Sequence, residues 1–271
     1  MINYSGNKIT LRSIICIVLI INISCNNSNP KKDKIVSKEG MIFIPGGTFE
    51  MGGDNDEARQ DEYPKHVVTI SSFWMDESEV TNAEFKKFVD ETGYITTAER
   101  KIDWQEIKKI LPPNTPKPHD SLLSPASLVF KETSVSNLND YSKWWSLIRN
   151  ANWRQPFGPG SNIDDKGNYP VVHISWEDAN EYCKWSGKRL PTEAEFEYAS
   201  RGGKINNIYS WGNEKVDIGQ LKANIWEGEF PTKNNINDKF YYASPIKSFK
   251  PNNYGIYDIA GNVWEWCFDW Y

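Results

Sequence analysis

The hydrophobic and polar positions after residue 40 predict short strands first and helices later. Met41–Ile44 and Thr48–Met51 are separated by Pro45-Gly46-Gly47, which indicates a strand, a turn and a second strand. Partial alternation over Val67–Met75 predicts one further strand. We therefore expect a small sheet at the start of the domain.

Three later segments have the spacing of capped helices. Thr81 is followed three residues later by Glu84, which is the capping-box pattern, and Phe85, Phe88 and Val89 then form an apolar face. Glycines stand just after the first two helices, where C-terminal caps belong. The helices are predicted from Thr81 to Gly93, from Ser175 to Ser186 ahead of Gly187, and from Thr192, which pairs with Glu195, to Ser200 ahead of Gly202-Gly203.

The rest of the chain is poor in regular patterns. Residues 94–150 are rich in Pro and Ser and predict a long excursion packed on the domain, and no helical periodicity follows Gly203. Large flat side chains are frequent, with 12 Trp, 13 Tyr and 12 Phe, and they are expected to hold the loops together with bound cations or disulfides. We predict one α+β domain over 41–271 with little regular secondary structure.

The first residues predict an export signal. Lys8 and Arg12 precede the apolar run Ile14–Ile21, which is short for a membrane anchor and suits a signal-peptide core. Cys25 and a polar stretch follow, so we expect residues 1–24 to be a signal and 25–40 a tether. The signal resembles that of a bacterial lipoprotein, which implies lipidation of Cys25; plain secretion and a retained signal are the alternatives. The protein is then exported to the periplasm or cell envelope.

Composition excludes several classes of function. The 31 Lys and Arg against 36 Asp and Glu give a net charge of -5, which argues against a nucleic-acid surface. The three His and four Cys lack the spacing of a zinc or iron–sulfur site. Neither a Gly-x-Ser-x-Gly elbow nor a phosphate loop occurs in the sequence. Cys183 and Cys267 are each a nucleophile, a disulfide partner or a buried apolar residue, and an oxidising compartment favours the disulfide.

Oxygen-bearing side chains gather in the Gly- and Asn-rich loops near the end of the chain. Asn224, Asp238, Asp258 and Glu265 are the main ones. Hard cations such as calcium take carboxylates mixed with backbone carbonyls from irregular chain. Local turn formation is the alternative explanation for each residue.

Motifs spread over residues 41–271 occur in one characteristic series. The segments are Met41–Gly52, Phe73–Asp76, Glu79–Asn82, Ala151–Pro156, Pro170–Trp176, Gly187–Glu195, Ala223–Pro231, Asn253–Asp258 and Gly261–Trp266. Together they resemble the formylglycine-generating enzyme family, also called sulfatase-modifying factor. Ala223-Asn224-Ile225-Trp226-Glu227-Gly228-Glu229-Phe230-Pro231 resembles the branch that activates sulfatases.

The resemblance implies a fold and an activity. The fold is similar to that of C-type lectins and carries structural calcium. The enzymes oxidise the cysteine of a Cys-x-Pro-x-Arg motif in an unfolded sulfatase to formylglycine, with dioxygen and a copper ion held by two cysteines. By position, the first calcium site takes Asn224, Ile225, Asp238 and Phe240, and the second takes Asp258, Gly261, Val263 and Glu265.

The chain departs from the family pattern in one respect. The copper-binding cysteine pair of the family follows the Trp264-Glu265-Trp266 motif at a distance that lies past Tyr271. We therefore expect the sequence to be C-terminally incomplete, to be inactive as it stands, and to leave Trp266 and Trp270 exposed. The resemblance also implies that Cys183 pairs with a cysteine of the same downstream region.

Two hypotheses of different classes follow. The first is a lipid-anchored formylglycine-generating oxidase that matures sulfatases. The second is a non-enzymatic lipoprotein that uses the same fold for structure or surface assembly, as gliding-motility lipoproteins do. A third, a sulfoxide-synthase-like oxidase of the same superfamily, is disfavoured because such enzymes add an iron-binding helical domain.

Overall fold

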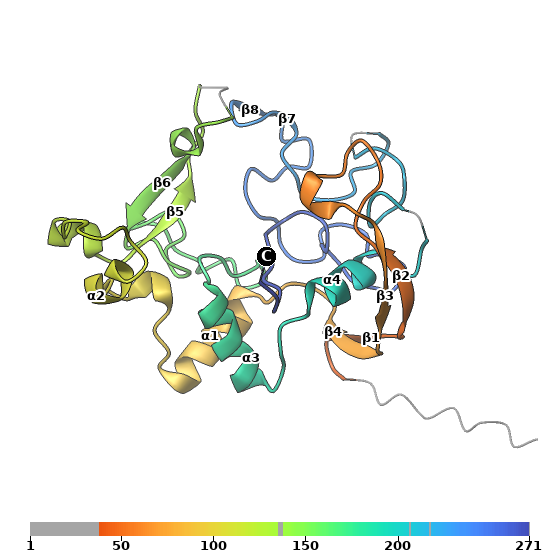
Figure 1. Cartoon of the computed structure of the whole chain (residues 1–271), viewed down its shortest axis with the longest axis horizontal. Coiled ribbons are helices and arrows are strands. Elements are labelled where there is room, and N and C mark those ends of the chain that lie inside the picture. The colour runs from red at the N-terminus through yellow and green to blue at the C-terminus, as the bar shows by residue number, and fades with distance from the viewer. Residues whose placement is uncertain (1–37, 135–137, 206, 217, 271) are drawn as a thin grey trace, which may run out of the picture. The chain divides into compact units, whose positions relative to one another are not determined.

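A long interrupted hairpin begins the described part of the chain. The computed structural model describes residues 38–134, 138–205, 207–216 and 218–270. Strand β1 (Met41–Ile44) pairs antiparallel with β4 (Phe73–Asp76), and β2 (Gly47–Met51) pairs with β3 (His66–Ile70). The register runs on without a shift, since Ile44 lies opposite Phe73 and Gly47 opposite Ile70. The two pairs therefore form one ribbon with a break (Figure 1).

The break corrects the prediction of one strand over Val67–Met75. Pro45 and Gly46 interrupt one side of the ribbon and Ser71 and Ser72 the other. Proline has no N–H to donate to a ladder. A Cβ on Gly46 would lie 2.7 Å from the Ile70 carbonyl oxygen and 2.8 Å from the Ser72 nitrogen, so the backbones approach too closely for another residue. The strand accordingly splits in two.

The three predicted helices are confirmed together with their caps. Thr81, Ser175 and Thr192 each accept a hydrogen bond from the backbone N–H three residues on, and the acid there bonds back to the cap. Gly93 and Gly187 end the first two with φ of 69° and 70°. The helices are α1 (Asn82–Thr92), α3 (Trp176–Ser186) and α4 (Glu193–Ser200).

The core lies where these helices meet the ribbon and the loops. Phe85 and Phe88 of α1 pack with Tyr182 of α3 and with Trp153, which is 1% exposed. A second cluster joins Ile44 of β1 to α4 and to the C-terminal loops. Aromatic rings thus do much of the packing, as the composition predicts.

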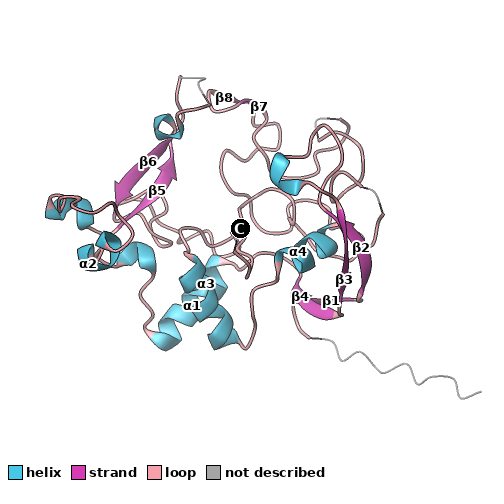
Figure 2. Ribbon diagram, viewed as in Figure 1, coloured by secondary structure: helices cyan, strands magenta, loops and turns pink. Residues whose placement is uncertain are grey.

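The excursion over 94–150 contains regular structure that the sequence pattern did not predict. Helix α2 (Trp104–Lys108) and an antiparallel ribbon of β5 (Ala126–Phe130) and β6 (Trp145–Arg149) form there. Loops fill most of the remainder, as Figure 2 shows, which confirms the expected α+β fold with few regular elements. The other short elements are β7 (Gly228–Glu229), β8 (Lys233–Asn234), and single 3-10 turns at Gln60–Glu62, Thr97–Glu99, Asp120–Leu123 and Tyr141–Lys143.

The predicted signal, most of the predicted tether and the predicted lipidation site fall before Lys38. Residues 1–37, and with them Cys25, lie outside the described residues. Within the described ranges, none of the helices is long and apolar enough to cross a membrane.

Candidate functional site

Asn262 joins the two predicted calcium sites. Its Oδ1 accepts hydrogen bonds from Asn224 Nδ2 at 3.0 Å and from the Ser244 backbone N–H at 2.8 Å. Its Nδ2 donates to Glu79 Oε1 at 2.9 Å, and its backbone N–H donates to the Asn224 carbonyl at 2.8 Å. One amide side chain therefore ties together loops that lie far apart in sequence.

The loop around Asn262 has an unusual backbone. Gly261 has φ of +102°, and a Cβ there would lie 2.5 Å from the Asn224 carbonyl oxygen. Asp258 and Asn262 adopt left-handed φ of 52° and 60°, a region that Asp and Asn enter more readily than other residues with a side chain. The loop therefore needs glycine, Asp and Asn at these places to keep its path.

The first predicted calcium site comes together in part. Asn224 Nδ2 donates to the Tyr242 carbonyl at 2.8 Å, which brings Asn224 beside the segment that contains Phe240. Asp238 Oδ1 accepts from the Phe240 N–H at 2.9 Å. Its Oδ2 is buried and has no partner among the described residues, and burial raises the pKa of this carboxyl. The role of the Ile225 carbonyl as a ligand of this site stays a prediction.

The second predicted site holds two acids in an unfavourable environment. Asp258 Oδ2 accepts from the Lys247 N–H at 2.5 Å, whereas its buried Oδ1 has no partner among the described residues. Glu265 is exposed to the central cleft, but protein atoms packed around the cleft desolvate its carboxyl group and raise its pKa to about 8. The charges of Glu79 and Asp258 raise it further. The carbonyls of Gly261 and Val263 remain predicted ligands.

Glu79 is a member of this cluster that the sequence analysis missed as a site residue. It is 6% exposed, and its Oε2 has no partner among the described residues. Burial raises its pKa to about 7, and the charge of Asp258 adds to the effect. Glu79 stands two residues before the Thr81 cap in a motif that gives it no role in the sequence pattern. Its partners, Asn262 and Asp258, lie near the other end of the chain.

These residues fit a hard cation. Asp238, Asp258 and Glu79 each keep a buried carboxylate oxygen without a partner in the described part of the chain. Such oxygens are costly unless a ligand satisfies them. Calcium takes carboxylate and carbonyl oxygens from irregular loops. Among the described residues, no three His, Cys, Asp or Glu side chains converge closely enough to form a metal site by themselves, so backbone carbonyls or water would complete the shell.

The cysteines do not fit a copper site. Cys183 and Cys267 are free thiols. Burial raises the pKa of Cys183, and it raises that of Cys267 to about 11. Cuprous ion binds thiolates, and burial disfavours the thiolate form of both residues.

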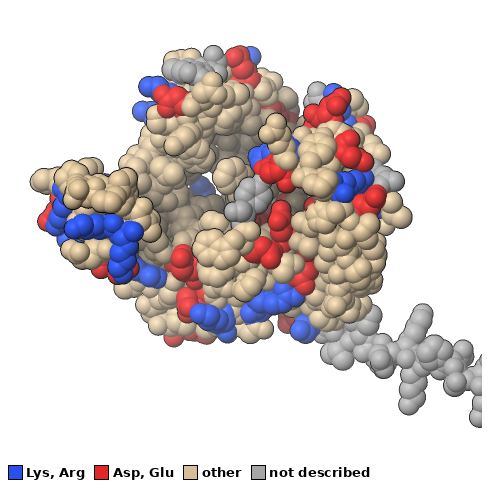
Figure 3. Space-filling model, in the orientation of Figure 1, with Lys and Arg blue, Asp and Glu red and all other residues tan. Residues whose placement is uncertain are grey.

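A cleft of about 1860 Å³ opens beside the candidate calcium loops. Figure 3 shows the hollow in the middle of the displayed face. Trp266 is 50% exposed and Trp270 is 96% exposed, so the predicted exposure of both is confirmed, and the neighbouring Trp264 is 99% exposed. Glu265 and several aromatic rings line the cleft, namely Phe130, Trp144, Trp145, Trp226, Phe230, Tyr241 and Tyr242.

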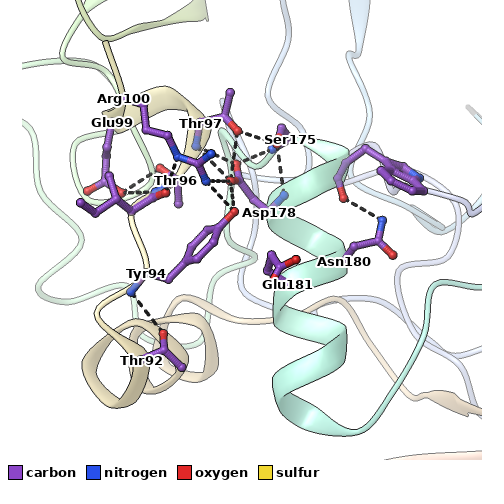
Figure 4. A network of polar contacts seen from close by, with 12 residues as sticks. Thr92, Tyr94, Thr96, Thr97, Glu99, Arg100, Ser175, Asp178, Asn180 and Glu181 are labelled. Atoms are coloured by element: carbon purple, nitrogen blue, oxygen red, sulfur yellow. Dashed lines mark hydrogen bonds and ion pairs between the residues drawn. The ribbon is translucent and has the colours of Figure 1, made fainter. Parts of the chain in front are cut away.

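A buried carboxylate fixes the segment that leads to the ribbon of β5 and β6. Asp178, at the start of α3, is 0% exposed and accepts from the Ser175 and Thr97 backbone N–H groups, both at 2.9 Å. The Tyr94 hydroxyl also donates to it at 2.9 Å, and Arg100 Nη2 donates to that hydroxyl at 2.7 Å (Figure 4). Burial, with the hydrogen bond to Asp178, raises the pKa of Tyr94 to about 12.

Comparison with known proteins places these features in a family. The model of the sulfatase-modifying factor enzyme 1-like domain matches residues 26–271. The chain belongs to this family. The formylglycine-generating enzyme of Mus musculus is 44% identical over 232 residues, which are 85% of this chain and 58% of that enzyme. This family member therefore spans less than two thirds of its mouse relative.

Two further comparisons qualify the assignment. A protein of Bos taurus named inactive C-alpha-formylglycine-generating enzyme 2 is 41% identical over 234 residues, covering 83% of this chain and 69% of that protein. Family membership therefore does not by itself establish activity. The structure of PvdO from Pseudomonas aeruginosa matches with a TM-score of 0.50 and 23% identity over 85% of this chain and 71% of that one, which supports the fold alone.

Proposed function

We propose that this protein is an exported formylglycine-generating oxidase that acts on the cysteine of a Cys-x-Pro-x-Arg motif in unfolded sulfatases. The observation that carries the proposal is the 44% identity to an enzyme of that name over 85% of the chain. In the reaction the Cβ of the cysteine becomes an aldehyde carbon with one oxygen atom of dioxygen, and the sulfur leaves as hydrogen sulfide. The other oxygen atom becomes water, and an external thiol that is oxidised to its disulfide supplies the two further electrons. The proposed location is the periplasm or cell envelope, with a lipid anchor at Cys25.

Calcium has a structural part in this proposal. One ion would be held by Asn224, Ile225, Asp238 and Phe240, and a second by Asp258, Gly261, Val263 and Glu265. The unpartnered carboxylate oxygens support this assignment, since a divalent cation offsets their mutual repulsion and their burial. Glu79, which bonds to Asn262, would add a further negative charge at the second ion.

Copper is proposed to bind at cysteines that follow Tyr271 in the complete protein. The two thiols in the described chain are unsuited to it, and the copper-binding cysteine pair is predicted past Tyr271, with a partner for Cys183 in the same region. No catalytic step is therefore assigned to a residue of this chain.

The oxidase assay tests the proposal. The complete protein encoded by the gene is loaded with copper(I) and calcium and incubated in air with a thiol reductant and a synthetic peptide that contains Cys-x-Pro-x-Arg. Mass spectrometry should find the aldehyde product, trapped as an oxime by a hydroxylamine. A peptide with serine in place of the cysteine serves as the control and should stay unchanged.

A second candidate is the structural lipoprotein of the same fold, and a family member named as inactive gives it weight. A complete reading frame without a cysteine pair, or a copper-loaded protein that leaves the peptide intact, would contradict the oxidase and favour this alternative.

A further inference from the structure

The ribbon of β5 and β6 has an uncovered apolar face. Leu128 of β5 lies directly opposite Leu147 of β6, and the two side chains are 54% and 58% exposed. Phe130 lies opposite Trp145, with ring centroids 5.9 Å apart. The other face packs inward, where Ser127 bonds to His173 at 2.8 Å. On this face Phe130 is partly covered by other rings, whereas the side chains of Leu128 and Leu147 are left largely exposed.

The outer edge of β5 is also unpaired. The Lys131 N–H donates to the Trp144 carbonyl and the Asn150 N–H to the Pro125 carbonyl, both at 2.8 Å. Antiparallel pairs alternate between bonded and non-bonded positions, so the N–H and C=O groups of Leu128 and Phe130 point away from β6. β5 pairs only with β6, and within the described residues no hydrogen bond reaches these outer groups. An open edge of this kind is a template for another strand.

The edge borders the central cleft and an aromatic wall. Leu128 and Phe130 of β5 line the cleft, and so does Trp145 at the start of β6, whereas Leu147 of β6 does not. The ring of Phe130 contacts Trp226 with centroids 5.3 Å apart and Phe230 with centroids 6.1 Å apart. Residues of the β5 edge strand and these rings thus line the same cleft.

We propose that the outer edge of β5 binds an extended segment of the unfolded substrate polypeptide as an added strand. The docking surface consists of the outward N–H and C=O groups of Leu128 and Phe130, with Trp226 and Phe230 as its wall. Main-chain pairing supplies affinity without demanding one sequence, and the rings accept apolar side chains on alternate positions. This inference rests on the proposed function, since it names where the substrate chain lies.

An unfolded polypeptide is the occupant that matches this chemistry. It presents free backbone donors and acceptors, which a folded domain keeps paired. Glu132 follows β5 by two residues, and its Oε2 accepts from the Tyr241 hydroxyl at 2.9 Å. Tyr241 lines the cleft, so this carboxylate places a negative charge beside it that complements the arginine of Cys-x-Pro-x-Arg.

A pair of proline variants isolates the edge. Leu128→Pro removes an N–H that points outward on β5, and Leu147→Pro removes the equivalent one on β6, so neither breaks the ladder between them. Both lose a leucine of nearly equal exposure, and thermal melts verify that both variants fold. Binding of a fluorescein-labelled peptide, with alanine in place of the cysteine of Cys-x-Pro-x-Arg, is measured by fluorescence anisotropy on the complete protein.

The expected result is that Leu128→Pro weakens peptide binding about tenfold while Leu147→Pro stays within about twofold of the unmodified chain. Peptides N-methylated on alternate backbone amides should lose affinity in one of the two registers. Equal affinity of both variants, or no binding by the unmodified chain, would overturn the inference. Sedimentation that shows a dimer dissolved by Leu128→Pro would overturn it as well, since a second copy would occupy the edge. The readout involves no oxidation, so it succeeds or fails independently of the oxidase assay.

Discussion

Replacement of Asp178 by asparagine should destabilise the protein strongly. The side chain keeps its size, but one carboxylate oxygen becomes an N–H donor in a fully buried position. That position is surrounded by donors, because the Ser175 and Thr97 N–H groups and the Tyr94 hydroxyl all point at Asp178 (Figure 4). At least one backbone N–H would then face another donor with no water to replace the lost acceptor.

The size of the effect follows from these contacts. A hydrogen bond to a charged group contributes about 1.5–3 kcal/mol, and loss of the charge weakens several at once. We expect Asp178→Asn to lower the free energy of unfolding by about 3–5 kcal/mol, a range typical of a broken buried charge network. With a typical urea dependence for a domain of this size, the unfolding midpoint falls by about 1–2 M.

Urea unfolding followed by tryptophan fluorescence measures this change. Glu177→Gln is the matched control, because Glu177 precedes Asp178 on the same helix and is exposed. It should change the free energy of unfolding by less than about 1 kcal/mol. An Asp178→Asn protein as stable as the Glu177→Gln protein would refute the role given to this carboxylate.

Three further outcomes are expected. Burial lowers the pKa of His173, so the unfolded state binds a proton more readily and the stability of the protein falls as pH drops below the ordinary value of 6.5. His173→Asn should reduce this loss of stability in thermal melts at acidic pH. Gly261→Ala should cost at least about 2 kcal/mol more than Gly160→Ala in urea unfolding, because both have positive φ but only Gly261 has a backbone oxygen at 2.5 Å. The pKa of Glu265 is raised to about 8, so in the presence of chelator the folded state loses stability as pH rises through that value. Glu265→Gln should lose less stability between pH 6 and 9 in thermal melts, and an equal loss would show that Glu265 is not the cause.

Local sequence signals predict helices α1, α3 and α4 because the causes of these helices are local. Thr81, Ser175 and Thr192 are each followed three residues later by the acidic residue that completes the capping box. The sequence pattern does not predict the break between β3 and β4, because the break depends on the close approach of Gly46 to Ile70 and Ser72 across the ribbon. Nor does it predict the ribbon of β5 and β6, because its strands are separated by a polar stretch and their pairing is visible only in three dimensions.

The candidate site divides in the same way. Asp238, Asp258 and Glu265 stand in loops whose composition already suggests a hard cation. Glu79 joins them through a hydrogen bond to Asn262 that spans 183 residues, which no local pattern reveals. The unpartnered oxygens, which carry the physical argument for calcium, are a property of packing alone.

Calcium binding by the chain itself tests the central claim most directly. The protein is stripped with chelator and titrated with calcium in a calorimeter, and its thermal midpoint is followed in parallel. The account predicts saturable binding of two ions and a midpoint that rises with calcium, with the Asp238→Asn protein losing one ion. Absence of binding heat together with a midpoint unaffected by calcium or chelator would contradict it.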